Sequence, residues 1–426
     1  MPKRILTSPS RKNKRNPYHT LYLQISGGIN MLSQNVYNKI NKSSWIRAMF
    51  EEGAKLRQIH GAENVYDFSL GNPDYEPPIE VKNAIKKYTS GECAGLHRYM
   101  SNAGHPEVRE RIAEKASEES GLPVTQNHII MTCGAAGGLN VVLKSILNPD
   151  DEVIVFSPYF VEYLFYIENA SGKPVVVPAD TRTFEPSLDD LAKSITPNCK
   201  AIIINSPNNP TGVVYSEATL KNIATLLEAK EKEFNSKILV ISDEPYSKIV
   251  YDQVEVPTIL KIFKHSAIVN SYSKSLAIPG ERVGYIVLNP SIPNVDLLVN
   301  GMIFCNRTLG FVNAPSLFQK VIADSLDTVV NTDEYKKRRD FLYNNLIELG
   351  YSCVKPQGAF YLFPESLIPD DIEFAKRALK YNLLIVPGSG FGCPGYFRLA
   401  YCVNFTSIKN SIPAFKALAE ECKGLK

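Results

Sequence analysis

The chain has 426 residues, 44% of them hydrophobic, and a formal net charge of +3. This length allows two or three domains with a large core, and the composition is that of a folded enzyme or binding protein. No apolar run approaches the roughly 18 residues of a membrane helix, and the eight cysteines form no CxxC pair, which argues against a membrane partner, a disulfide framework and a zinc site. A reducing, cytoplasmic location fits best.

Residues 1–30 form a basic leader without acidic residues, which we expect to be disordered. An organelle import sequence is one interpretation, although a clean amphipathic period is missing; an extension ahead of Met31 is the other. Without this leader the net charge becomes −3, so the folded part gives no support for a nucleic-acid partner. The six basic residues of the leader are Lys3, Arg4, Arg11, Lys12, Lys14 and Arg15.

From residue 127 to residue 274, short apolar runs alternate with amphipathic stretches. Runs such as 201–204 and 238–241 are apolar on both faces, which is typical of strands in a sheet covered by helices. The pattern predicts an α/β domain with a mainly parallel sheet, whose ligands bind beyond the carboxyl ends of the strands. The residues that the sequence places at such ends are Gly134, Pro158, Asn209, Asp243 and Lys274.

The remaining segments predict a smaller α+β domain. Helical patterns cover residues 44–64, 333–351, 371–382 and 406–423, and strand patterns cover 358–365, 383–388 and 396–403. The helical segment near the start should pack with the elements near the end. We therefore expect a discontinuous small domain of residues 31–75 and 315–426, and a large domain of residues 76–314.

The segment "SYSKSLAIPGERVGY", residues 271–285, holds a single lysine at a predicted strand end. An amine that is removed from bulk water and lies near other cations becomes a nucleophile that can form a Schiff base. A lone lysine is more often a solvated surface residue. The neighbouring Ser271, Ser273 and Arg282 supply two hydroxyls and a guanidinium, which suit an anionic phosphate.

Three further motifs fit the same site. The stretch "TCGAAGGLNVVLKSIL" follows an apolar run and opens a helix, so it either approaches a phosphate or packs tightly on the sheet. Asp243, after "KILVIS", could pair with a protonated ring nitrogen or act as a turn or cap residue. Asn209, in "NSPNNPTG", is a turn former or a donor to a ligand.

Together these motifs resemble the aspartate aminotransferase family, class I/II, of the fold type I pyridoxal phosphate enzymes. The resemblance extends from about residue 43 to residue 423. It also makes the bond between Asn209 and Pro210 a candidate cis peptide, because family members have cis peptide bonds in this neighbourhood. The matching motifs, in chain order, are "GNPDYEPP" with Gly71, "YMSNAGHPEVRE" with Tyr99, "GAAGG" at 134–138, "SPYF" at 157–160, "NNPTG" at 208–212, "DEPY" at 243–246, "SYSK" with "GERVGY", and "YFRLAY" with Arg398.

This resemblance implies a large domain with a mainly parallel seven-stranded sheet flanked by helices, and a smaller α+β domain. It also implies an aminotransferase that moves an α-amino group from an L-amino acid, with aspartate as one candidate, to a 2-oxo acid by ping-pong exchange. The cofactor would be pyridoxal 5'-phosphate, and family members are homodimers with active sites at the interface.

The resemblance also implies the role of each matching residue. Lys274 would hold the cofactor as a Schiff base and then carry the substrate's α-proton. Asp243 would keep the ring nitrogen protonated, Tyr246 and Asn209 would bond the ring oxygen, and Phe160 would stack on the ring. Arg398, with Gly71 and Asn209, would bind the substrate carboxylate. The phosphate would be held by Ser271, Ser273, Arg282, the backbone of Ala135 and Ala136, and Tyr99 of the partner subunit.

The sequence departs from the family pattern where a distal carboxylate would bind. One bacterial branch has a lysine in the glycine-rich loop, and Ala136 occupies that position here. Another branch uses an arginine of the neighbouring subunit, and Arg307 in "CNRTLGFVNAPS" lies close to that place, displaced by one residue. We hypothesise that Arg307 selects a distal carboxylate in the partner's site; a salt bridge at a surface or interface is the alternative.

Other functions remain open at this stage. A fold type I relative could be a carbon–sulfur β-lyase or a decarboxylase, because Arg398 directs cleavage to the α C–H bond without excluding elimination of a β-leaving group. A ligand-sensing domain of a transcription regulator is disfavoured because the leader has no helix-turn-helix pattern. The sequence contains neither HExxH nor GxSxG, so we expect no metal site and no serine triad.

Overall fold

The computed structural model describes residues 31–42, 44–91 and 93–423. Helix α1 (Gln34–Lys42) belongs to one compact unit, Met1–Ser44, and the second unit is Trp45–Lys426. The leader of residues 1–30 lies outside the described residues. The fold and the site described below belong to the second unit.

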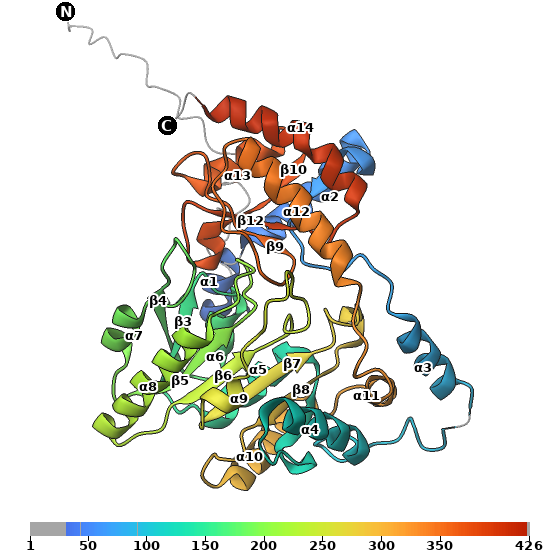
Figure 1. The fold of residues 1–426 in the computed structure, drawn as a ribbon, viewed down its shortest axis with the longest axis vertical. Coiled ribbons are helices and arrows are strands. Elements are labelled where there is room, and N and C mark those ends of the chain that lie inside the picture. Colours follow the sequence, from blue (N-terminus) through green and yellow to red (C-terminus); the bar gives the residue numbers. More distant parts are fainter. Residues whose placement is uncertain (1–30, 43, 92, 424–426) are drawn as a thin grey trace, which may run out of the picture. The chain divides into compact units, whose positions relative to one another are not determined.

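A seven-stranded sheet forms the centre of this unit (Figure 1). The strand order is β2-β8-β7-β6-β5-β3-β4, and β8 alone of these strands runs antiparallel to both of its neighbours. This arrangement confirms the predicted mainly parallel sheet. The strands are β2 (Ile129–Thr132), β3 (Glu152–Ser157), β4 (Lys173–Pro178), β5 (Cys199–Asn205), β6 (Leu239–Asp243), β7 (Ser266–Ser271) and β8 (Gly284–Leu288).

Both faces of the sheet are covered, as the apolar runs predict. Alternate residues of each strand face opposite sides. Val155 packs in the cluster that includes residues of α5 (Gly134–Ile146), α6 (Glu162–Asn169) and α10 (Val295–Thr308). Ile154 packs in the cluster that includes residues of α7 (Leu188–Ser194), α8 (Glu217–Phe234) and α9 (Ile259–Ile262). A third cluster joins α3 (Ile79–Thr89), α4 (Pro106–Ser120) and α11 (Ser316–Ala323) to the β2–β8 edge. The result is a rigid sheet whose strand ends can position polar side chains.

The helices begin and end with recognisable local signals. Ser216 caps α8 by accepting a hydrogen bond from the backbone N–H of Thr219, and Asn331 caps α12 through Asp333 and Glu334. The helices of the second unit are α2 (Ser44–His60), α3 (Ile79–Thr89), α4 (Pro106–Ser120), α5 (Gly134–Ile146), α6 (Glu162–Asn169), α7 (Leu188–Ser194), α8 (Glu217–Phe234), α9 (Ile259–Ile262), α10 (Val295–Thr308), α11 (Ser316–Ala323), α12 (Thr332–Glu348), α13 (Asp371–Leu379) and α14 (Phe405–Cys422).

Two small sheets lie outside the central one. Strand β1 (Tyr66–Asp67) pairs with β10 (Leu383–Leu384), and β11 (Val386–Pro387), β12 (Phe397–Ala400) and β9 (Tyr361–Leu362) form a three-stranded sheet. The prediction of one strand over residues 383–388 is therefore wrong, since the chain changes sheets at Ile385. Pro387 lacks a backbone N–H and fits the edge position that β11 occupies.

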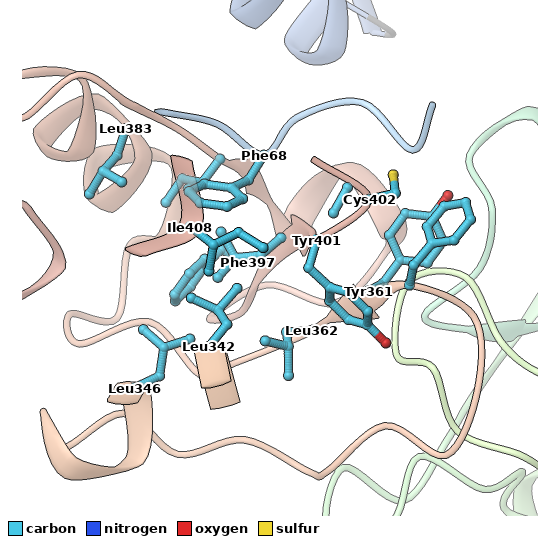
Figure 2. Packing of buried hydrophobic residues seen from close by; sticks show 14 of the residues in the cluster. Phe68, Leu342, Leu346, Tyr361, Leu362, Leu383, Phe397, Tyr401, Cys402 and Ile408 are labelled. Atoms are coloured by element: carbon cyan, nitrogen blue, oxygen red, sulfur yellow. The ribbon is translucent and has the colours of Figure 1, made fainter. Parts of the chain in front are cut away.

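A hydrophobic cluster brings the two ends of the second unit together (Figure 2). Phe68 lies in it with Phe415 of α14, and their ring centroids are 5.8 Å apart. The cluster also contains Leu342 and Leu346 of α12. These contacts agree with a small domain built from both ends of the chain, and the domain boundaries stay a prediction. Among the described residues, no helix has the length and apolar character to cross a membrane.

Candidate active site

A cavity of about 360 Å³ opens at the carboxyl ends of β5, β6 and β7. The structure brings together there all but two of the site residues predicted from the sequence. Those lining the cavity are Gly71, Ala135, Ala136, Phe160, Asn209, Asp243, Tyr246, Ser271, Ser273, Lys274, Arg282 and Arg398.

Lys274 extends into this cavity from the turn after β7. Its Nζ donates a hydrogen bond to the carbonyl oxygen of Gly71 at 2.7 Å and lies 5.7 Å from the ring centroid of Phe360. Burial, together with the charges of Arg398 and Arg282, lowers its pKa from the usual 10.5 to about 8. A substantial fraction of this amine is therefore neutral, and nucleophilic, slightly above neutral pH.

Asp243, the last residue of β6, offers one unused oxygen to the cavity. Its Oδ2 accepts a hydrogen bond from the hydroxyl of Tyr163, whereas its buried Oδ1 has no partner among the described residues. Burial raises the pKa of this carboxyl from 3.8 to about 7, opposed by the Tyr163 hydrogen bond. A buried carboxylate oxygen without a donor is costly, so this oxygen fits a ligand that brings an N–H or a cation.

Asn205, at the end of β5, hydrogen-bonds to the backbone of both Asp243 and Asn209. Its Nδ2 donates to the backbone carbonyl of Asp243 at 2.9 Å, and its Oδ1 accepts from the backbone N–H of Asn209 at 2.7 Å. The peptide bond between Asn209 and Pro210 is cis, as predicted. The ends of two adjacent strands are thereby tied to each other beneath the cavity.

The opposite end of the cavity has the chemistry of an anion site. Helix α5 begins at Gly134, whose φ is +69°, and an added Cβ would lie 3.0 Å from Nη2 of Arg282. Glycine therefore allows both the left-handed backbone and the close approach of the guanidinium. The N-terminus of α5, the hydroxyls of Ser271 and Ser273 and the guanidinium of Arg282 suit a phosphate.

Arg398, on β12, is a buried guanidinium without a carboxylate partner among the described residues. Its Nη1 donates to Oδ1 of Asn209 at 3.1 Å and its Nη2 to the carbonyl of Ser69 at 2.6 Å, while its Nε is buried without a partner. Burial lowers the pKa of Arg398. An uncompensated buried cation of this kind fits a bound carboxylate.

Among the cavity residues not foreseen from the sequence, three form hydrogen bonds to predicted site residues. Tyr163 and Asn205 support Asp243, and the hydroxyl of Tyr361 lies 2.8 Å from that of Tyr246. Asn205 is the last residue of a strand that the apolar run predicted, so its position at a strand end could have identified it as a site residue. The phenols of Tyr163 and Tyr361 carried no such signal, because a tyrosine in a helical or strand pattern is more often part of the core.

Tyr99 and Arg307 lie outside the cavity of their own chain. The side chain of Tyr99 is 95% exposed, and the residue lines a separate shallow depression with Phe311 and Asn313. Arg307, in the last turn of α10, is exposed with its guanidinium 5.6 Å from the ring centroid of Phe304. Their predicted roles in a partner's site remain predictions.

A second cavity, of about 300 Å³, is lined by residues on the other face of the same strands. Glu244, Asn270 and Tyr272 line it, each next in sequence to a residue of the first cavity. Burial raises the pKa of the Glu244 carboxyl from 4.5 to about 8. None of the site residues predicted from the sequence lines this second cavity.

Comparison with known proteins assigns the family. Residues 63–412 match the family described as aminotransferase class I and II. The chain belongs to this family. It is 32% identical over 367 residues to a probable aspartate aminotransferase of Methanocaldococcus jannaschii. The aligned region covers 83% of this chain and 93% of the relative. The aspartate/prephenate aminotransferase of Thermus thermophilus is 32% identical over 353 residues, covering 82% of this chain and 89% of the relative.

Solved structures of aminotransferases share the fold. A crystal structure of an amino transferase from Eubacterium rectale has a TM-score of 0.89 and 40% identity, covering 92% of this chain and 100% of the other. The aspartate aminotransferase of Thermus thermophilus with maleate has a TM-score of 0.81 and 29% identity, with the same coverage. These matches confirm the predicted family and fold. The protein is a transaminase acting on an amino acid and a 2-oxo acid, and the lyase alternative is not favoured.

Proposed function

We propose that this aminotransferase holds pyridoxal 5'-phosphate on Lys274 and transfers the amino group of an L-amino acid, with aspartate as one candidate, to a 2-oxo acid by ping-pong exchange. One observation carries the proposal: the cavity combines a buried lysine of lowered pKa with a buried carboxylate oxygen of Asp243 that has no donor. A pyridinium N–H would supply the missing donor, and the anion site around Arg282 would take the phosphate.

Different residues of the cavity would bind the phosphate, the ring face and the ring oxygen of the cofactor. Ser271, Ser273 and Arg282, with the backbone of Ala135 and Ala136, would hold the phosphate. Phe160 would cover one ring face, and Tyr246 and Asn209 would donate hydrogen bonds to the ring oxygen. Once bound, pyridoxal phosphate supplies an electron sink for the substrate α-carbon and a carrier for the amino group.

Lys274 has two successive tasks. Its neutral Nζ would hold pyridoxal phosphate covalently until the substrate amine binds. The same Nζ then accepts the proton from the substrate α-carbon, and the lowered pKa suits both acceptance and return of that proton near neutral pH. Arg398 binds the substrate α-carboxylate through its guanidinium, which Asn209 and the Ser69 carbonyl already orient.

A homodimer would complete the site. Tyr99 is almost fully exposed, and Phe304 and Leu309 are 56% and 40% exposed, so these side chains are available for contact with a partner subunit. In the proposed dimer Tyr99 reaches the phosphate of the partner's site. Arg307 reaches the distal carboxylate of a dicarboxylic substrate there, since the cations lining the chain's own cavity, Lys274, Arg282 and Arg398, are already assigned.

The experiment that tests this function is an absorption titration of the purified protein. Single amino acids are added without a 2-oxo acid, beginning with aspartate, glutamate, leucine and phenylalanine. We expect the yellow band of the lysine-bound cofactor to bleach stoichiometrically and to return when a 2-oxo acid is added. The variant Lys274→Ala should lack the band of the covalently bound cofactor. A wild-type protein that gives no band after incubation with pyridoxal phosphate would contradict the proposal.

A further inference from the structure

Tyr361, the first residue of β9, touches three of the groups proposed to act on cofactor and substrate. It is 2% exposed, and its hydroxyl lies 2.8 Å from the hydroxyl of Tyr246. Its ring centroid lies 4.8 Å from Cζ of Arg398. These contacts link the residue proposed to bond the ring oxygen with the residue proposed to bind the substrate carboxylate.

The third contact is with Gly71. A Cβ added at Gly71 would lie 2.0 Å from the hydroxyl oxygen of Tyr361, a distance that no side chain could occupy. Gly71 therefore has to be glycine because the phenol of Tyr361 fills the space beside it. The carbonyl of the same Gly71 accepts the hydrogen bond of Lys274, so Tyr361 also supports the segment that contacts the reactive amine.

Two aromatic rings lie close to the guanidinium of Arg398. Phe391 lies on the guanidinium at 4.8 Å from its ring centroid, the same distance as Tyr361. A cation within about 6 Å of an aromatic ring centroid gains electrostatic attraction, and two such contacts restrict the rotation of the guanidinium. The planar fork of Arg398 is thereby fixed without using the hydrogen-bonding positions that a bound carboxylate needs.

The hydrogen bond between the two phenols has a direction. Each hydroxyl has one proton, so if Tyr246 donates into the cavity, Tyr361 has to be the donor to Tyr246. Burial raises the pKa of Tyr361 to about 12, opposed by Arg398, and raises that of Tyr246 well above 10. Both phenols keep their protons at neutral pH, although the charge of Arg398 acts to lower the pKa of each.

We infer that Tyr361 is a positioning residue, whose hydroxyl directs the proton of Tyr246 toward the cofactor's ring oxygen and whose ring orients Arg398 for the substrate carboxylate. The inference rests on the proposed function. It assigns two separable tasks to one side chain. The hydroxyl acts on the cofactor through Tyr246, and the ring acts on the substrate through Arg398.

Two variants separate the tasks. Tyr361→Phe removes the hydroxyl and keeps the ring, so we expect weaker donation by Tyr246 to the ring oxygen. Its expected signatures are a higher pKa for the visible absorption change of the cofactor-bound enzyme, a cofactor dissociation constant raised about tenfold, and an almost unchanged KM for the amino acid. Tyr361→Leu also removes the ring and should in addition raise that KM by about tenfold.

A double-mutant cycle tests whether the hydroxyl acts through its partner. In a Tyr246→Phe background, Tyr361→Phe should add nothing to the spectral pKa or the cofactor dissociation constant. Additive effects, or a Tyr361→Phe enzyme whose spectrum and dissociation constant equal those of wild type, would overturn the inference. Should the phenylalanine variant not fold, Tyr361→Leu replaces it in the cycle. Additive effects of Tyr361→Leu and Tyr246→Phe on the spectral pKa or the cofactor dissociation constant would then overturn the inference.

A matched control is available in Tyr401. This tyrosine is also fully buried in the same cluster, and its hydroxyl donates to the carbonyl of Ala359 at 3.2 Å, but it does not line the cavity. Tyr401→Phe should leave the spectral pKa unchanged. A wild-type protein that binds no pyridoxal phosphate would defeat the proposed function itself, whereas normal binding with an additive cycle would defeat only the role of Tyr361.

Discussion

Asp243 and Glu244 are adjacent carboxyl groups with different surroundings. Successive residues at the end of a strand face opposite sides of a sheet, so Asp243 lines the proposed catalytic cavity and Glu244 lines the cavity behind it. Burial raises the pKa of each of them, to about 7 and about 8 respectively. The pKa of both carboxyl groups is thus raised, and only the one with a proposed ligand should matter for catalysis.

The first prediction compares the two residues directly. Asp243→Asn keeps the shape but loses the negative charge that would hold the ring nitrogen protonated, so we expect kcat to fall by roughly 100- to 1,000-fold. Glu244→Gln, the matched control one residue away, should change kcat by less than about twofold. Steady-state kinetics of both variants on one amino donor measures the difference. Equal losses would show that Asp243 acts only as a structural residue.

The second prediction concerns the pH dependence of Lys274. Because its pKa is lowered to about 8 from 10.5, the neutral amine becomes the major form above about pH 8. The rate at which pyridoxal phosphate attaches to the cofactor-free enzyme should therefore rise with pH and level off above that value. Stopped-flow absorbance between pH 6 and pH 9.5 measures it.

The neighbouring cation provides the control for that measurement. Arg398 contributes to the lowered pKa of Lys274, so Arg398→Met should shift the midpoint of the rate profile to higher pH. A rate that does not change between pH 6 and pH 9.5, or a midpoint unaffected by Arg398→Met, would count against the neutral amine as the nucleophile.

At the scale of the elements, the strand ends were predictable and their supports were not. Apolar runs followed by Asn209, Asp243 and Lys274 placed those residues correctly at one edge of the sheet, because a parallel sheet brings its carboxyl ends together. Tyr361 is 115 residues from Tyr246 and pairs with it only through tertiary packing. The change of sheet at Ile385 was missed for the same reason, since one continuous apolar run can serve two different partner strands.

The third prediction concerns Glu244, the residue that follows β6. A carboxyl whose folded pKa of about 8 exceeds its ordinary value of 4.5 binds more protons in the folded state than in the unfolded state. Its contribution to stability is therefore lost as the pH rises through this range. Glu244→Gln removes the loss, so the free energy of unfolding of the variant relative to wild type should increase by roughly 1–3 kcal/mol from pH 5 to pH 8.

Denaturant unfolding of the cofactor-free protein at the two pH values, at fixed protein concentration, measures this difference. Ser242→Ala serves as a second variant, because Ser242 donates a hydrogen bond to Oε1 of Glu244 at 2.7 Å. Removing this donor should raise the folded pKa of Glu244 further and steepen the loss of stability with pH. The prediction would be contradicted if the free energies of unfolding of Glu244→Gln and wild type differed by the same amount at both pH values.

At the scale of the whole molecule, the proposed dimer makes substrate choice a property of two chains. Arg307 lies outside its own cavity, so its proposed contact with a distal carboxylate requires the partner subunit. The fourth prediction is that Arg307→Leu lowers kcat/KM for aspartate by about 10- to 150-fold, the loss of one charge-assisted hydrogen bond, and leaves leucine almost unchanged. Kinetics on the two amino acids measures it, and equal losses would indicate a structural role.

The fifth prediction tests whether that arginine acts across the subunit interface. Lys274→Ala subunits lack the nucleophile, and Arg307→Leu subunits lack the carboxylate contact, so either homodimer should be poor with aspartate. In a hybrid dimer, the intact Lys274 of one chain meets the intact Arg307 of the other, and one native site forms. Equal mixing with random exchange should restore roughly a quarter of the wild-type activity on aspartate. Activity that stays at the mean of the two parents after exchange would show that Arg307 does not act in trans.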